Sequence, residues 1–210
     1  MRRDYGDQVT RSLAGRVVLR NGVEIEEPLS VVLGFLETWP FDVGDDSASF
    51  GESDLRRANA GGARISAAEI AAILERRRAI ERALRTIAPD SSLTGSANAV
   101  PWLPLRQLFD AFADLRGVGF SKMTKALHAK RPALIPMLDS VVQKYLREDD
   151  LGAQAPFGER ALGLVRGYKR DLDHNRAALR AIRQELTRRR YGLTEVRILD
   201  LLIWSVEAAA

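Results

Sequence analysis

An apolar repeat at helical spacing returns along most of the 210-residue chain and limits the possible folds more than any other feature. Apolar side chains three and four residues apart share one face of a helix, so each such segment predicts a helix with one buried face. The segments cover about residues 29–38, 66–88, 104–114, 120–129, 138–146, 158–171, 174–190 and 196–206. The sequence therefore predicts a mainly α fold, a compact multi-helix domain.

A short region near the N-terminus departs from the helical pattern. Two β-prone runs, residues 16–20 and 23–26, flank Asn21-Gly22, and this dipeptide strongly favours a tight hairpin turn. We expect a hairpin with a helix, a loop-rich stretch and a helical core to follow one another within one structural domain. These three stretches cover residues 1–40, 41–65 and 66–210.

The composition excludes several kinds of chemistry. The chain has no cysteine, so disulfides, thiolate metal sites, iron–sulfur clusters and cysteine nucleophiles are impossible. Its two histidines, His128 and His174, are too few for a histidine-rich metal site, and we expect His128 at the surface. We expect no cofactor and no metal. The chain lacks an apolar run long enough for a membrane span and an apolar leader, so we expect a cytoplasmic protein with no membrane partner.

Positive charge is concentrated in residues 116–147. This segment carries seven cations and one acid, a net charge of +6, whereas the whole chain has a net charge of only +4. The cations are Arg116, Lys122, Lys125, Lys130, Arg131, Lys144 and Arg147, and the acid is Asp139. Surfaces usually mix both signs of charge, so a basic surface of this kind favours a polyanionic partner such as nucleic acid.

The basic segment begins with a glycine-rich turn, Arg116-Gly117-Val118-Gly119. Glycine accepts a positive φ and leaves room for a close approach to the backbone. The amides at the start of the next helix then point outward without partners, and they suit a phosphate group. Val118 can pack between the two helices, while Lys122 and Lys125 can add charge. Such a site would bind nucleic acid without reading its sequence.

The residues Leu115-Arg116-Gly117-Val118-Gly119 resemble the hairpin of the helix-hairpin-helix DNA-binding motif, which would cover residues 104–130. Residues 104–147 also resemble the core of the helix-hairpin-helix DNA glycosylases. In that family a catalytic Asp follows the hairpin by about 20 residues, after a proline-containing link and before a Val-rich helix; the resemblance places Asp139 there. The lyase lysine of the family corresponds to Ser121, so the resemblance implies a monofunctional enzyme.

Two of these features have a purely structural alternative. Asp139 also lies where the following helix needs an N-cap, and Asp is among the best N-cap residues. The glycine turn can simply connect two packed helices. A second resemblance carries no activity: Arg197-Ile198-Leu199-Asp200 with Trp204, together with the hairpin segment, is similar to a bacterial family of unknown function.

The sequence thus favours DNA binding without sequence preference. The contacts would come from Arg116, Gly117, Val118, Gly119, Ser121, Lys122 and Lys125. If about four to six phosphates are engaged, the slope of log K against log salt should be about −4 to −5. Two alternatives stay open: a glycosylase-like base-excision enzyme that uses Asp139, and a protein-interaction or regulatory module. The arginine-rich face of residues 76–85 is either a solvated face with ion pairs or a second phosphate-contacting face.

Overall fold

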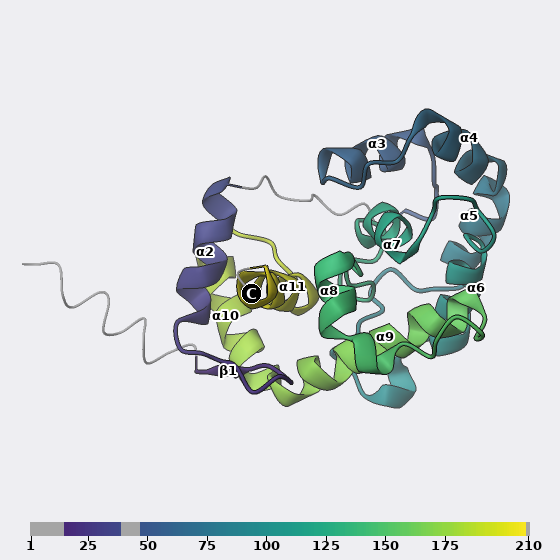
Figure 1. The fold of residues 1–210 in the computed structure, drawn as a ribbon. Helices are drawn as coiled ribbons and strands as arrows, with labels where there is room; N and C mark the ends of the chain where they lie inside the picture. The colour runs from purple at the N-terminus through teal and green to yellow at the C-terminus, as the bar shows by residue number, and fades with distance from the viewer. Residues whose placement is uncertain (1–14, 39–46, 209–210) are drawn as a thin grey trace, which may run out of the picture.

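The computed structural model describes residues 15–38 and 47–208, and it confirms the mainly α fold (Figure 1). Strands β1 (Val17–Val18) and β2 (Glu24–Ile25) form the predicted antiparallel hairpin, with Val17 opposite Ile25. Gly22 has a φ of +80° in the turn, a conformation that glycine adopts without strain. The prediction from Asn21-Gly22 is therefore confirmed.

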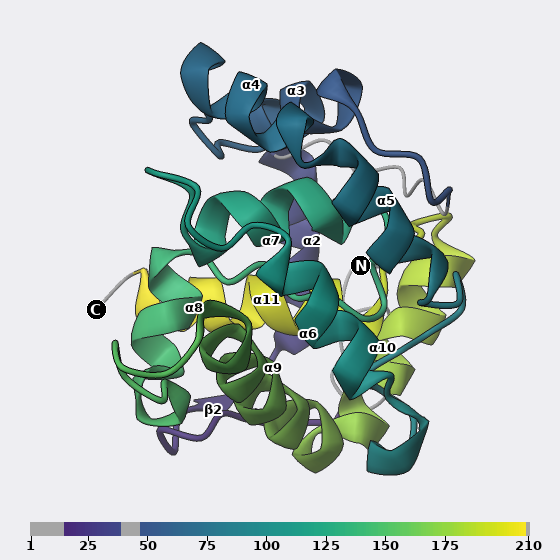
Figure 2. The same ribbon diagram turned by 90° about the vertical axis from the view of Figure 1, so that its right-hand side faces the viewer.

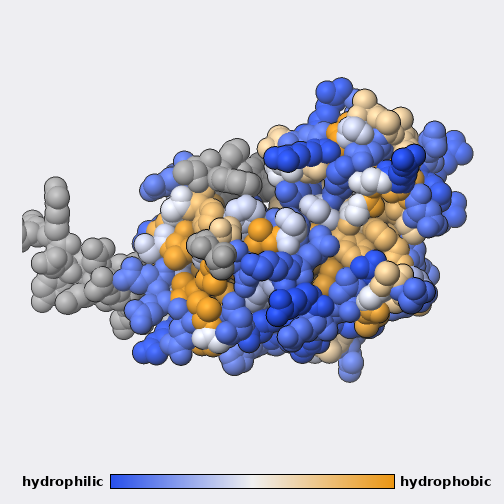
Figure 3. Space-filling view, in the orientation of Figure 1, coloured by the Kyte–Doolittle hydropathy of each residue, from blue (hydrophilic) through white to orange (hydrophobic). Residues whose placement is uncertain are grey.

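One side of the molecule is built around the C-terminal helix α11 (Glu195–Glu207). Helices α2 (Pro28–Thr38) and α10 (Arg176–Arg188) pack against it (Figure 1). Most of α11 is buried because its apolar residues surround the helix on several sides. Apolar groups remain visible on the surface over α2, where several of its side chains are only partly buried (Figure 3).

The other side contains the helices of the middle of the chain. These are α3 (Glu52–Ala60), α4 (Ala67–Glu75), α5 (Arg77–Arg85), α6 (Trp102–Asp110) and α7 (Phe120–His128). Helix α3 packs against α7, and α6 lies between α5 and α9 (Phe157–His174) (Figure 2). Helix α8 (Ser140–Tyr145) packs against α11, so α8 and α9 join the two sides (Figure 1). Two single 3₁₀ turns, η1 (Ala97–Ala99) and η2 (Arg147–Asp149), complete the fold.

The structure corrects two details of the predicted helices. Residues 52–60, which belong to the predicted loop-rich stretch, form a nine-residue helix. The segment 66–88 is two helices that are separated at Arg76. The periodicity alone could not show this break, because α4 packs against α3 while α5 packs against α6, and the bend lets each helix follow its own partner. Residues 41–46 of the loop-rich stretch lie outside the described residues.

Within the described ranges, no helix is both long enough and apolar enough to cross a membrane. His128, which we expected at the surface, is buried, so that prediction is wrong. Its Nδ1 lies 2.6 Å from the carbonyl oxygen of Ile135. The side chain therefore forms part of the contact between α7 and the proline-containing link that follows.

Candidate functional sites

The glycine turn between α6 and α7 has the compact geometry that the sequence indicated. Gly117 has a φ of +82°, which explains why glycine occupies this position. The Val118 amide donates to the Leu115 carbonyl at 3.0 Å, and the Val118 side chain is only 5% exposed. Gly119 is the N-cap residue of α7 in an extended conformation. The turn thus buries Val118 and directs the start of α7 outward.

The first amides of α7 are available to a ligand. Gly119 has no side chain to cap the helix, and a Cβ placed on it would meet nothing within 4 Å. In the described part of the chain, the amides of Phe120, Ser121 and Lys122 donate to no protein acceptor. A helix N-terminus with free amides and its positive dipole attracts an anion. Arg116 is exposed immediately before this group.

An acid from α4 already lies against the hairpin. Glu69 accepts hydrogen bonds from Lys122 Nζ at 2.7 and 2.8 Å and from the Ser66 amide at 2.8 Å. A side chain added at Gly117 would overlap the Glu69 carboxylate. The hydrogen bond from Lys122, followed by that from Ser66, holds the pKa of Glu69 below its ordinary value. Glu69 therefore partly neutralises the positive charge of Lys122.

The rest of the basic segment does not form one surface. Lys125 Nζ donates to the carbonyls of Gly61 and Gly62 at 3.2 and 3.4 Å, just after α3. Lys130 is 1% exposed and lies 2.9 Å from the Asp54 carboxylate. Arg131 is 2% exposed and donates to carbonyls at the end of α5. The expectation of a single basic surface is thus wrong for Lys130 and Arg131, because acceptors from α3 and α5 draw both cations into the interior.

Asp139 is the N-cap residue of α8. Its Oδ1 accepts the amides of Val141 and Val142 at 3.1 and 3.0 Å, and its Oδ2 accepts Trp204 Nε1 at 2.7 Å. The side chain is only 9% exposed. Both carboxylate oxygens therefore serve the fold, which confirms the capping interpretation. The catalytic role that the glycosylase resemblance implied stays a prediction.

A second acid, Asp200 of α11, is fully enclosed near Asp139. Its Oδ2 accepts the Met137 amide at 3.3 Å, while its Oδ1 has no hydrogen-bond partner in the described part of the chain. Burial raises the pKa of Asp200 from 3.8 to about 7, although Arg197 and Tyr168 partly oppose this effect. The carboxyl group is thus mostly neutral in the folded protein at pH values well below this raised pKa.

The exposed face of α5 carries more positive charge than its acids neutralise. Glu81 accepts the Phe50 amide at 3.0 Å and Arg77 Nε at 2.9 Å, and it lies 3.6 Å from Arg85. Arg78 and Arg82 are exposed and form no ion pair with the residues that the structure describes. Both alternatives for this face therefore have support: part of it is paired, and part of it is unpaired.

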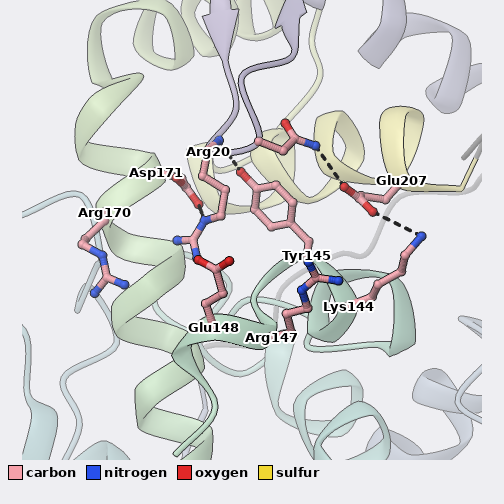
Figure 4. A pocket seen from close by; sticks show the side chains of 9 residues that line it. Arg20, Lys144, Tyr145, Arg147, Glu148, Arg170, Asp171 and Glu207 are labelled. Atoms are coloured by element: carbon pink, nitrogen blue, oxygen red, sulfur yellow. Dashed lines mark hydrogen bonds and ion pairs between the residues drawn. The ribbon is translucent and has the colours of Figure 1, made fainter.

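A pocket of about 420 Å³ lies on another part of the surface, where the tip of the β-hairpin meets α8, η2, α9 and the end of α11 (Figure 4). Each residue that lines it has a polar or charged side chain. The lining residues are Arg20, Asn21, Lys144, Tyr145, Arg147, Glu148, Arg170, Asp171 and Glu207. Lys144 and Arg147 are the last two cations of the basic segment. They line this pocket and do not belong to the hairpin between α6 and α7.

Arg20 holds one wall of this pocket in place. Its Nε donates to Asp171 at 2.9 Å, a second nitrogen pairs with Asp149, and a third donates to the Gly167 carbonyl at 2.7 Å. The guanidinium also lies over the Tyr145 ring, 5.2 Å from its centre. A side chain at position 167 would overlap Asp149, so glycine is required where η2 approaches α9.

Three groups at this wall, Arg20, Tyr145 and Asp171, have shifted pKa values. Burial raises the pKa of Tyr145 and of Asp171, and Arg20 partly opposes the shift of Asp171. Burial lowers the pKa of Arg20, but Asp149 and Asp171 outweigh this and leave it raised. A concave site with several shifted groups is a candidate functional site. Sequence reasoning missed it because Arg20 and Asp171 are separated by 151 positions and no local motif joins them.

Comparison with known proteins gives a family but no activity. Residues 37–207 match a family described as a family of unknown function, DUF6308, and the chain belongs to this family. No curated protein and no solved structure matches the chain. The second resemblance, to a family of unknown function, is thus supported.

Proposed function

We propose that the chain binds the phosphate backbone of DNA, without sequence preference, through the hairpin between α6 and α7. The observation that carries this proposal is the group of free amides at Phe120, Ser121 and Lys122, next to the open Gly119. Backbone amides at a helix start can bind a phosphate oxygen, and the missing side chain at Gly119 allows the close approach. Arg116 adds an exposed positive charge beside them.

The proposed site is smaller than the sequence indicated. Lys130 and Arg131 are buried, Lys125 contacts carbonyl groups, and Lys122 shares its charge with Glu69. Arg116 and Lys122 are therefore the two cations of the hairpin that can reach phosphates. We expect a slope of log K against log salt of about −2 from the hairpin, and a steeper slope only if Arg78 and Arg82 of α5 also bind.

Fluorescence anisotropy with a labelled duplex over a salt series tests this function. The Arg116→Gln/Lys122→Gln variant should bind the duplex more weakly, and its slope of log K against log salt should be less steep by about one to two. Arg176→Gln/Arg180→Gln, two exposed positions one turn apart on α10, removes the same charge and should leave the slope nearly unchanged. Absence of binding at low salt, or equal losses in both variants, would refute the hairpin as the DNA site.

Glu69 supplies a further arm of the same experiment. Its carboxylate occupies Lys122 and lies against Gly117, where a phosphate would compete with it. Glu69→Gln removes this competing charge, so duplex affinity should rise a few-fold at low salt. An unchanged or lower affinity would show that Lys122 does not contact DNA.

The base-excision alternative depends on Asp139. Its support is the resemblance of residues 104–147, while the contacts to Val141, Val142 and Trp204 account for this acid without catalysis. Single-turnover release of a damaged base, lost in Asp139→Asn with duplex binding kept, would establish this activity. A partner captured with no dependence on salt, in the absence of duplex binding, would instead support a protein-interaction module.

A further inference from the structure

The pocket beside Arg20 is a second candidate site that does not depend on the proposed DNA-binding hairpin. Its volume of about 420 Å³ falls within the range of about 300 to 1,000 Å³ that is common for small-molecule sites. Four separate parts of the chain line it (Figure 4). A small polar molecule therefore fits its size, whereas a nucleic acid duplex does not enter a pocket of this volume.

The wall of the pocket is held in one conformation before any ligand arrives. Arg20 is fixed by three acceptors, and its carboxylate partners Asp149 and Asp171 have side chains only 10% and 8% exposed. Removing so many charges from water costs free energy, and an apolar core of similar volume is often at least as stable. A binding site benefits from such a wall, because a preorganised site loses little entropy when a ligand binds.

Three cations at the mouth come from different elements, and Lys144 and Arg147 are neutralised less than Arg170. Lys144 of α8 is 57% exposed and lies 3.6 Å from Glu207. Arg170 of α9 is 64% exposed and shares Asp149 with Arg20. Arg147 of η2 is exposed and has no ion pair with any residue that the structure describes. Guanidinium and ammonium groups supply many donors, which matches the several acceptor oxygens of a phosphate.

The same mouth also presents acceptors. Glu148 is exposed and has no ion-pair partner in the described part of the chain. Glu207 accepts a hydrogen bond from Asn21 at 3.0 Å and has further acceptor capacity. These carboxylates would repel a bare anion, but they can accept hydrogen bonds from hydroxyl groups. A ligand with both a phosphate and hydroxyl groups satisfies the cations and the acids together.

We propose that this pocket binds a sugar phosphate, with Arg147 and Lys144 contacting the phosphate and Glu148 accepting from a sugar hydroxyl. Figure 4 shows these residues around the same opening as the fixed Arg20. The ligand can be a free sugar phosphate or the sugar phosphate at the end of a nucleic acid strand. Both sources present the same chemistry to the pocket.

Isothermal titration calorimetry of the full chain with ribose 5-phosphate tests the proposal. We expect binding that weakens at least tenfold in Lys144→Gln/Arg147→Gln, two exposed positions whose loss should not disturb folding. Arg176→Gln/Arg180→Gln serves as the matched control and should bind like the wild type. Absence of binding at millimolar ribose 5-phosphate, or equal affinity in the pocket variant and the control, overturns the proposal.

A second variant tests the role of the acid and the source of the ligand. Glu148→Gln should weaken the binding of ribose 5-phosphate several-fold more than the binding of inorganic phosphate. If the binding of both ligands weakens equally, the pocket does not recognise a sugar. Displacement of ribose 5-phosphate by a 5′-phosphorylated strand indicates the nucleic acid source, and no displacement indicates the free metabolite. The Lys144→Gln/Arg147→Gln variant keeps the hairpin intact, so failure of this proposal and failure of the DNA proposal give separate results.

Discussion

The hairpin between α6 and α7 and the pocket beside Arg20 both present basic side chains, but the chain builds the two sites in different ways. The hairpin is made by one short stretch of chain, residues 115–122, and its free amides follow from the local turn. The pocket is assembled from four stretches of the chain that are far apart in the sequence. The net charge of a segment therefore says little about the charge that a surface offers, because the fold decides which cations meet acids and carbonyl groups.

The two regions also differ in how their acids are held. Near the hairpin, hydrogen bonds from Lys122 and the Ser66 amide keep the pKa of Glu69 low. In the interior, burial raises the pKa of Asp171 at the pocket and of Asp200 in α11. Glu69 thus adds stability that is lost as the pH falls, whereas the buried acids add stability that is lost as the pH rises.

The largest effect that we expect concerns Asp200. A pKa near 7 in place of 3.8 favours the neutral form in the folded state by on the order of 4 kcal/mol. This contribution is complete below the unfolded pKa and disappears as the pH rises toward 7. Relative to Asp200→Asn, the wild type should therefore lose about 3 kcal/mol of unfolding free energy between about pH 5 and about pH 8.

Urea unfolding of both proteins at these two pH values measures that difference, and the comparison cancels the titration of all other groups. If the wild type and Asp200→Asn change in parallel with pH, the buried carboxyl is not neutral in the folded state. The opposite trend would mean that a cation stabilises its charged form.

An intermediate effect distinguishes the ion pairs of the two regions. Arg20→Ala leaves the mostly buried Asp171 without its cation and leaves Asp149 with only the exposed Arg170, so it should cost about 2 kcal/mol of unfolding free energy. Lys122→Ala removes a pair nearer to the surface, whose side chains are 23% and 15% exposed, and should cost less than about 1 kcal/mol. Denaturant unfolding at neutral pH compares the two, and equal costs would remove the distinction that we draw.

A further, modest effect concerns Asp139, at the start of helix α8, whose far end lines the pocket. Asp139→Ala removes the cap of α8 and the acceptor for Trp204, so we expect a loss of about 1 to 2 kcal/mol. Asp139→Asn keeps a good N-cap and should lose less. Thermal unfolding of both variants checks this order, and an unchanged stability in Asp139→Ala would contradict the capping role.

Much of the fold could be predicted because its signals are local. The apolar repeats placed most helices, and Asn21-Gly22 placed the β-hairpin. The break at Arg76 was missed because it depends on two different packing partners. His128 was misplaced for a similar reason: its burial follows from the contact with Ile135, which no periodicity reveals.

The sequence by itself determined the helical fold, the glycine turn at Gly117 and the N-cap at Asp139. These features depend on backbone preferences and hydrogen bonds within a few residues. Only the tertiary structure decided where the positive charges lie. Lys130 and Arg131 are buried, Lys122 pairs with Glu69, and Arg147 lines a pocket. The reason is that a long cationic side chain goes to whichever acceptors the packing brings within reach, and those acceptors come from distant parts of the chain.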